Sequence, residues 1–479
     1  MSFFDSDLMS ALPELFLLTA TCIVLVVDVY LPDHYRLYTY RLAQVSVVIT
    51  AGLCLALFPE SPRITFTGTF VGDSMGTLLK VFILLTTYFV FFYSKVYLQA
   101  RGLLKGEYFV LGLFAVLGMM VLVSAHSLLT VYLGLELLSL SLYAMVAMNR
   151  ESGTASEAAM KYFVLGALAS GMLLYGMSMI YGATGTLDLT LIREQVSGLE
   201  SRNLILILGL VFVIVGIAFK LGAVPFHMWV PDVYEGAPTS VTLFIGSAPK
   251  IAAFGMLMRL LVDGLPGLQS DWISMLVILS VLSMGVGNIV AIAQTNLKRM
   301  LAYSTIAHVG FLFLGIIAGT NAGYSASMFY IIVYAFMSLG GFAMIVLLGH
   351  AGFEADRIED FRGLNDRNPW YAFLMLILMM SMAGVPPFLG FWAKWSVLRE
   401  VVAADMTWLA VVAVVFSIVG VFYYLRVIRM MYFEKAEDAA PVESGADMRM
   451  MVSANALAIL ALGIYPTGLL ALCVSALGG

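Results

Sequence analysis

Apolar runs about as long as a membrane is thick alternate with short polar segments along the whole chain. A helix needs roughly 20 apolar residues to cross the hydrocarbon layer of a bilayer. Bounded by charged residues, proline or glycine, these runs predict fourteen spans, near residues 11–31, 41–59, 77–98, 106–124, 127–148, 158–182, 204–237, 241–262, 272–295, 300–319, 324–349, 370–400, 406–432 and 450–474. The pattern therefore predicts an all-α polytopic membrane protein.

The composition agrees with a chain that lies mostly within lipid. Of its 479 residues, 61% are hydrophobic and 11% are charged, whereas soluble domains contain about 25% charged residues. The net charge of −5 is spread over many loops and indicates no nucleic-acid partner. The three cysteines, Cys22, Cys54 and Cys473, are far apart, and the chain has no nucleotide-binding motif. We therefore predict that this chain binds no metal and no cofactor.

Basic residues in the short loops predict the orientation of the chain, because cytoplasmic loops are enriched in lysine and arginine. Loops that follow odd-numbered spans hold fourteen basic residues, and loops that follow even-numbered spans hold five. This bias predicts that both termini lie outside the cytoplasm, on the periplasmic side of a bacterial inner membrane.

The predicted span at 204–237 is too long for one plain helix and has a break in its middle. Lys220 follows sixteen residues without a charge and lies two residues before the sequence Gly222-Ala223-Val224-Pro225. Proline removes a backbone donor and kinks a helix. A lysine at the bilayer centre costs roughly 2.5–3.5 kcal/mol on insertion scales, so such residues usually face a polar interior. Lys220 is therefore the strongest candidate for a functional residue.

The predicted span at 370–400 repeats this arrangement with the sequence Ala383-Gly384-Val385-Pro386-Pro387 and with Lys394. The two broken spans are five spans apart, so repeats that contain them run in opposite directions across the membrane. Inverted repeats with broken helices are typical of ion-transporting proteins. We predict one membrane domain with N-terminal spans 1–3 in 1–105, a first repeat at 106–262, a second repeat at 270–433 and span 14 in 449–479.

Titratable residues within the predicted spans form the candidate site. Burial favours the neutral form of lysine, and histidine exchanges protons near neutral pH. A proton relay therefore explains the set Glu136, Lys220, Lys250, His308 and Lys394. Structural alternatives remain open: a neutral hydrogen-bonded Glu136, a Lys250 at a helix terminus, a packed His308, and a Lys394 that reaches the membrane surface.

Other charged residues give weaker signals. His227, just after the first break, and Lys161 are secondary relay candidates, although Lys161 equally suits an i,i+4 ion pair with Glu157. We expect solvent to surround Glu14, Asp28 and Lys80, which lie near the ends of spans. The mixed-charge segment at 353–367 is expected to be a solvated cytoplasmic segment or a contact with a partner subunit.

Three segments resemble the antiporter-like membrane subunits of respiratory complex I: FKLGAVPFHMWVPDVYEGAPTSV, LKRMLAYSTIAHVGFLFLG and AGVPPFLGFWAKW. The resemblance extends from about span 4 to span 13. VPFHMWVPDVYEGAP is also shared with the large subunits of multisubunit sodium/proton antiporters. Lysine rather than glutamate in FWAKW resembles one type of these complex I subunits and argues against a neighbouring paralogue and some antiporter subunits.

The resemblance implies a proton-translocating subunit of an NADH-quinone oxidoreductase. It implies that Glu136 and Lys220 form the ion pair of one half-channel, that Lys250 is the central relay, that His308 is a connecting residue, and that Lys394 is the exit-side lysine. It further implies that NADH, flavin mononucleotide, iron–sulfur clusters and quinone bind to partner subunits of the complex. Two alternatives remain: a subunit of a multisubunit cation/proton antiporter, and a scaffold subunit of complex I that carries no protons.

Overall fold

The structure, a computed structural model, describes residues 3–198, 203–349, 353–435 and 445–478. Among these residues, thirteen helical segments are long and apolar enough to cross a membrane. The predicted span at 370–400 consists instead of two 15-residue helices, Pro369–Ala383 and Leu389–Ala403, each too short to cross alone. The prediction of an all-α polytopic membrane protein is confirmed.

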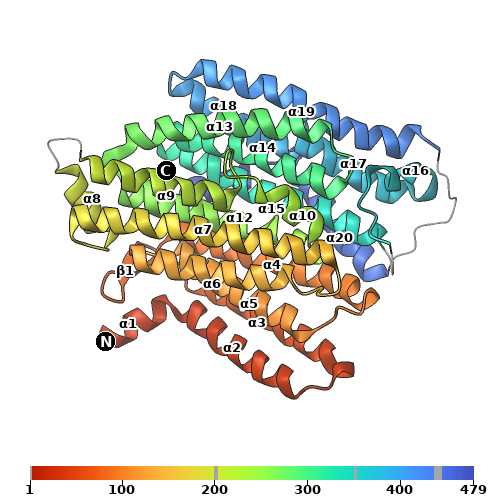
Figure 1. Cartoon of the computed structure of the whole chain (residues 1–479), viewed down its shortest axis with the longest axis horizontal. Helices are drawn as coiled ribbons and strands as arrows, with labels where there is room; N and C mark the ends of the chain where they lie inside the picture. The colour runs from red at the N-terminus through yellow and green to blue at the C-terminus, as the bar shows by residue number, and fades with distance from the viewer. Residues whose placement is uncertain (1–2, 199–202, 350–352, 436–444, 479) are drawn as a thin grey trace. The chain divides into compact units, whose positions relative to one another are not determined.

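The chain divides into two compact units, and the first comprises Met1–Phe91, Leu103–Leu221 and Ala248–Met275. In Figure 1 its long helices α4, α6 and α7, orange to yellow, run nearly parallel. Its elements are α1 (Phe3–Ser10), α2 (Leu12–Tyr30), α3 (Arg36–Ala56), β1 (Arg63–Thr65), β2 (Phe70–Gly72), the first part of α4 (Ser74–Ala100), α5 (Gly106–Val123), α6 (Leu128–Val146), α7 (Gly153–Thr184), α8 (Leu189–Ser197), α9 (Leu204–Leu221), α12 (Ala248–Leu257), a π-helical turn (Met258–Gly264) and the start of α13 (Gln269–Ile292).

The second unit comprises Phe92–Gly102, Gly222–Ser247 and Leu276–Gly479. Besides the remaining parts of α4 and α13, it contains α10 (Trp229–Gly236), α11 (Thr239–Ile245), α14 (Leu297–Ile317), α15 (Asn321–Leu348), α16 (Leu364–Arg367), α17 (Pro369–Ala383), α18 (Leu389–Ala403), α19 (Thr407–Phe433), α20 (Ala446–Ile464) and α21 (Thr467–Ala476). α14 and α15 form its core, and most of their residues are buried.

Polar side chains cap the start of α6, which carries Glu136, of α14, which carries His308, and of α17, which precedes the second break. Ser127 accepts a hydrogen bond from the backbone of Leu129 at the start of α6, and Asn296 does the same for Arg299 at the start of α14. Asn368 caps α17 through Tyr371. Such caps satisfy amides that the first helical turn leaves free, and they fix where these helices begin.

The sequence did not predict the short elements between the spans. β1 pairs with β2 in an antiparallel hairpin, with Ile64 opposite Val71. α1 and α8 are also short, with eight and nine residues. Windows of about 20 residues, which identify membrane spans, do not register elements of this length.

One cluster of hydrogen bonds in the first unit agrees with the predicted alternation of the spans. The buried Arg259 guanidinium contacts both oxygens of Asp73 at 2.7 and 2.8 Å and Asp263 at 2.9 Å. It also donates to the carbonyl of Val123 at 2.9 Å. The cluster joins the start of α4, the end of α5 and the end of the eighth span, which fourteen alternating spans place on one side of the membrane.

A second cluster, in the second unit, corrects in part the expectation of a solvated segment at 353–367, in which Arg357, Glu359 and Asp366 are exposed. The Glu354 carboxylate accepts hydrogen bonds from Tyr97 at 2.6 Å, Arg101 at 2.9 Å and Thr239 at 2.8 Å. Ile358, Phe361 and Leu364 are buried. The hydrogen bonds of Glu354 therefore hold this segment against the end of α4 and the start of α11. The apolar residues between its charged residues pack inward.

The expectation of solvent around Glu14, Asp28 and Lys80 is wrong. Lys80 forms an ion pair with Glu14 at 2.5 Å, and both side chains are buried. Asp28 is also buried; it pairs with Arg36 at 2.7 Å and accepts a hydrogen bond from Thr39 at 2.6 Å. Position near a span end does not expose these residues, because neighbouring helices supply partners of opposite charge.

Candidate functional site

The first break in a membrane helix leaves backbone carbonyls that a buried lysine binds. α9 ends at Leu221, and Gly222 follows with a φ of +83°. The amine of Lys250, on α12, donates to the carbonyl of Leu221 at 2.9 Å and lies 3.4 Å from that of Lys220. Lys250 is 1% exposed. The last carbonyls of a helix lack helical partners and carry partial negative charge, so they stabilise a cation here.

Lys220 points to different partners. Its amine donates to the hydroxyl of Ser139 at 2.6 Å and lies 3.5 Å from that of Tyr143, both on α6. Among the described residues, Glu136 Oε1 is buried without a hydrogen-bond partner. The lysine therefore binds the helix that carries Glu136, with Ser139 one turn beyond the carboxylate. The direct ion pair between Glu136 and Lys220 stays a prediction.

Ser139 and Tyr143 are contacts that the sequence analysis missed. They follow Glu136 by three and seven residues, a spacing that places side chains on one face of a helix. Gly166 of α7 leaves room for the Tyr143 hydroxyl, because an added methyl group would collide with that oxygen. Helical spacing from Glu136 would have been a usable signal for both residues.

The second break repeats the capping by a buried lysine. α17 ends at Ala383, and Gly384 has a φ of +84°. The amine of Lys394 donates to the carbonyl of Ala383 and to the hydroxyl of Ser417, both at 2.9 Å. Lys394 is 9% exposed, so the alternative that it reaches the membrane surface is wrong. Its side chain points into the protein toward the end of α17.

His308 lies in a network of hydroxyl groups in the core of the second unit. Its Nδ1 is 2.7 Å from the hydroxyl of Tyr330, and its Nε2 is 3.2 Å from that of Tyr424. The Tyr424 hydroxyl is also 2.5 Å from that of Ser304. Both nitrogens of His308 thus have partners able to donate or accept a proton, which fits a connecting residue.

The ring of Phe311 contacts both Tyr330, a partner of His308, and the amine of Lys394. The Phe311 ring stacks on Tyr330 with centroids 6.3 Å apart, and the Lys394 amine is 5.0 Å from the Phe311 centroid. Phenylalanine has no exchangeable proton, so passage between these residues requires water. The Phe311 ring thus separates the hydroxyl groups around His308 from the Lys394 amine and interrupts a chain of hydrogen bonds between them.

The two secondary candidates have distinct surroundings. His227 is half-buried in the turn after the first break, and among the described residues its Nδ1 has no hydrogen-bond partner. Lys161 forms the expected pair with Glu157 at 2.8 Å on the surface of α7. The helix-surface ion pair is confirmed, whereas relay roles for both residues stay predictions.

The three cysteines do not fit an iron–sulfur cluster held by four thiolates. Cys22 is exposed on α2, whereas Cys54 and Cys473 are buried in other helices. No group of three or more metal-binding side chains occurs in the part of the chain that the structure describes. Iron–sulfur clusters are typically held by four cysteine thiolates, which this chain does not possess.

Comparison with known proteins identifies the family. The family described as NADH:quinone oxidoreductase/Mrp antiporter, transmembrane region, matches residues 125–420, which contain every relay candidate. The chain is 58% identical over 478 residues to NADH-quinone oxidoreductase subunit N of Thioalkalivibrio sulfidiphilus, covering 100% of both chains. It is also 58% identical over 468 residues to the subunit N of Thiobacillus denitrificans, covering 98% of this chain and 97% of that one.

A solved structure agrees with these relatives. A chain in respiratory complex I from Thermus thermophilus with bound aureothin matches with a TM-score of 0.82 and 32% identity, covering 96% of this chain and 99% of that chain. The resemblance inferred from the three sequence segments is thereby confirmed. This multi-span membrane protein belongs to the NADH-quinone oxidoreductase subunit N family.

Proposed function

We propose that this chain carries protons across a bacterial inner membrane as a subunit of NADH-quinone oxidoreductase, through Glu136, Lys220, Lys250, His308 and Lys394. One observation carries the proposal: in each broken span, a buried lysine amine binds the carbonyl at the end of the first half-helix. Apolar packing does not require an amine at such a place, whereas reversible protonation does.

The geometry suggests how a break controls proton occupancy. A charged amine has three protons to donate, and it gains most from carbonyls at a helix end. A shift of Leu221 away from Lys250, or of Ala383 away from Lys394, would remove this stabilisation and favour release of the proton. Return of the carbonyl would favour its uptake. Each break thus acts as a site whose proton affinity follows backbone movement.

The redox chemistry belongs, in this proposal, to partner subunits of the same complex. NADH, flavin mononucleotide, iron–sulfur clusters and quinone would bind there, since the dispersed cysteines of this chain do not fit a cluster. An optical spectrum of the purified chain should show no flavin, haem or iron–sulfur band. A flavin or haem band near one equivalent would contradict this assignment. Mass spectrometry after mild detergent extraction should find other complex I subunits among the co-purifying chains.

Both termini are proposed to lie on the periplasmic side. A tag in 263–271 should be accessible from outside, and tags at 351 or in 435–448 should be accessible from the cytoplasm. Residue 351 and most of the second insertion range lie outside the described residues. Opposite accessibility at either place would overturn the predicted orientation.

Lys220 provides the test that separates proton relay from scaffold. Lys220→Arg keeps the positive charge, but arginine does not release its proton in proteins. Lys220→Met removes the charge and the proton together. We expect the Arg variant to assemble normally and to pump poorly, as measured by NADH-driven proton uptake in inverted vesicles.

Two parallel measurements complete this test. Native gels report assembly, and electron transfer to a quinone reports the redox reaction. Moving a proton against 100 mV stores about 2.3 kcal/mol, so loss of transfer should appear as loss of coupling. Normal pumping by the Arg variant would rule out Lys220 as an obligatory carrier. NADH-independent cation/proton exchange by the intact wild-type assembly would instead favour the antiporter alternative.

A further inference from the structure

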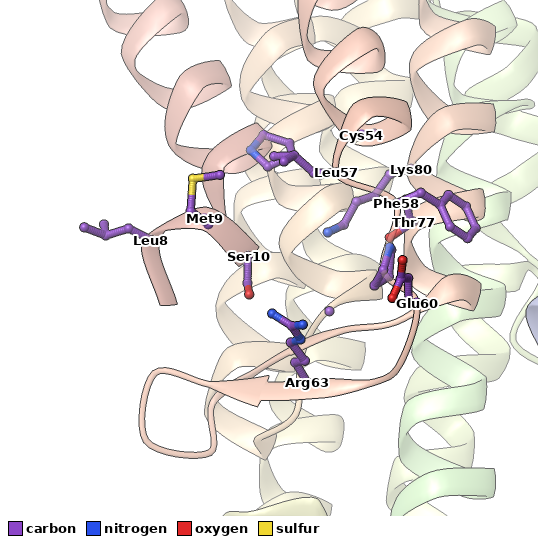
Figure 2. Close-up of a pocket in the computed structure, with 13 residues that line it drawn as sticks. Leu8, Met9, Ser10, Cys54, Leu57, Phe58, Glu60, Arg63, Thr77 and Lys80 are labelled. Carbon is purple, nitrogen blue, oxygen red and sulfur yellow. The ribbon is translucent and has the colours of Figure 1, made fainter. Parts of the chain in front are cut away.

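A cavity of about 800 Å³ lies in the N-terminal part of the first unit, outside the region that the family match covers. Its wall is formed by α1, the start of α2, the end of α3, the hairpin and the start of α4 (Figure 2). Small-molecule sites commonly have volumes of about 300–1,000 Å³. The cavity is thus large enough for an organic ligand and contains none of the relay candidates.

The cavity lies at the ends of two helices that are long and apolar enough to cross a membrane. α3 ends at Ala56, α4 begins at Ser74, and the hairpin stands between them. Leu8, Met9 and Phe58 line the cavity and are exposed. An apolar rim at the end of two spans is suited to the upper part of a lipid chain.

Three charged residues line the cavity, Glu60, Arg63 and Lys80, and their environments differ. Lys80 is buried and pairs with Glu14, so its charge is already balanced within the protein. Glu60 and Arg63 are exposed, and their side chains form no hydrogen bond or ion pair with another described residue. Figure 2 shows the Arg63 guanidinium pointing from the hairpin toward Ser10, and Glu60 beside Thr77. One cation and one anion are therefore presented to a ligand.

We propose that this cavity binds one phospholipid whose headgroup carries both a phosphate and a primary ammonium group, the phosphatidylethanolamine class. Arg63 would bind the phosphate, since guanidinium forms paired hydrogen bonds with phosphate oxygens. Glu60 would accept hydrogen bonds from the ammonium group. Leu57, Phe58 and Met9 would contact the first part of an acyl chain.

The charge pattern distinguishes this lipid from others. A purely anionic headgroup would leave the Glu60 carboxylate facing a second negative charge. A choline headgroup has no N–H group to donate to Glu60. The ethanolamine headgroup satisfies both residues, so the site should prefer it over both of those lipids.

Native mass spectrometry of the intact, delipidated complex provides the test. Phosphatidylethanolamine, phosphatidylcholine and phosphatidylglycerol would be titrated separately, and phosphoethanolamine would serve as a headgroup without chains. We expect retention of one ethanolamine lipid at this chain, about tenfold tighter than the choline lipid, which corresponds to roughly 1.4 kcal/mol. Phosphoethanolamine alone should bind far more weakly, because it lacks the apolar contacts.

Two substitutions and a control sharpen the result. Glu60→Gln should abolish the preference for ethanolamine over choline while leaving some binding. Arg63→Gln should weaken binding of all three phospholipids. Arg193→Gln, an exposed arginine on α8, should change neither. Equal affinity for every headgroup would indicate a non-selective boundary lipid and overturn the proposal, as would tight binding of phosphoethanolamine alone or equal loss in the Arg193→Gln control.

Discussion

The two broken spans share one local geometry but obtain their lysines from different places. In both, a glycine with positive φ ends the first half-helix, and a buried amine binds the carbonyl just before it. At the second break that amine belongs to Lys394, eleven residues further along the same span. At the first break it belongs to Lys250 on the following span, twenty-nine residues after Leu221.

The contacts at the two breaks pair the lysines of the two repeats differently from the sequence pattern. The sequence pattern pairs Lys220 with Lys394, because each lies in a broken span. By its contacts, Lys394 instead corresponds to Lys250, since both bind a carbonyl at a helix end. Lys220 binds hydroxyl groups on α6 and has no such carbonyl contact among the described residues. Similar motifs in a repeat can therefore assign different contacts to their lysines.

Removal of the capping amines should produce the largest effects. We expect Lys250→Met and Lys394→Met each to slow proton transfer on the order of 100-fold, the range for loss of a positioned proton carrier. NADH-driven acidification of inverted vesicles measures this loss. Lys435→Met, at the end of the described segment after α19, is a matched control and should pump normally. A large loss in only one of the two variants would break the correspondence between Lys250 and Lys394.

A methyl group at the second break should reduce stability. Gly384 has a positive φ, and a Cβ there would lie 2.8 Å from Cδ of Lys394. We expect Gly384→Ala to reduce the free energy of unfolding by about 1–2 kcal/mol, the usual penalty for this backbone conformation. Thermal unfolding in detergent measures this change.

A matched variant tests whether the glycine itself matters. Gly171 on α7 has open space around an added Cβ, so Gly171→Ala should be neutral or slightly stabilising. If the two alanine variants unfolded at the same temperature, the second break would not depend on its glycine.

The hydroxyl partners should matter more for Lys220 than for Lys394. Ser139→Ala removes the shortest hydrogen bond of Lys220, whereas Ser417→Ala leaves Lys394 bound to Ala383. A hydrogen bond contributes about 0.5–1.5 kcal/mol net, so Ser139→Ala should slow pumping several-fold and Ser417→Ala less. Ser139→Thr retains the hydroxyl and should recover activity. Equal rates for both alanine variants would remove this distinction between the lysines.

The Glu354 cluster should show a smaller, pH-dependent effect on stability. Burial opposes ionisation of this carboxyl, but Lys298, Tyr97 and Arg101 together hold the pKa of Glu354 below its usual range. A depressed pKa in the folded state stabilises the protein above the unfolded pKa, and this contribution disappears as pH falls through the folded value.

Glu354→Gln should therefore lower the unfolding temperature slightly at pH 7. We expect about 1 kcal/mol or less, because the side chain is partly solvated and charged pairs near water are weak. Thermal unfolding of both proteins from pH 7 down to acid should show the difference shrink as wild-type Glu354 protonates. A difference that persists unchanged in acid would show that the carboxylate charge is not its cause.

The sequence by itself determined the membrane spans, the two breaks and the candidate residues. Length and hydropathy suffice for spans, because every backbone polar group within lipid must be satisfied inside a helix. Glycine and proline mark Gly222 and Gly384 as breaks for similarly local reasons. A lysine or glutamate within an apolar run can be recognised as a candidate functional residue from the sequence alone, since a charge in lipid is unfavourable.

Only the tertiary structure decided which atoms each charged group contacts. Ser139 is 81 residues from Lys220 in sequence, and Glu354 is 257 residues from Tyr97. No local pattern specifies such pairs, because they depend on how separate helices pack and where each one ends. The same reason explains the buried pair of Glu14 and Lys80, where charges that look solvated in sequence are brought together by packing of α2 and α4.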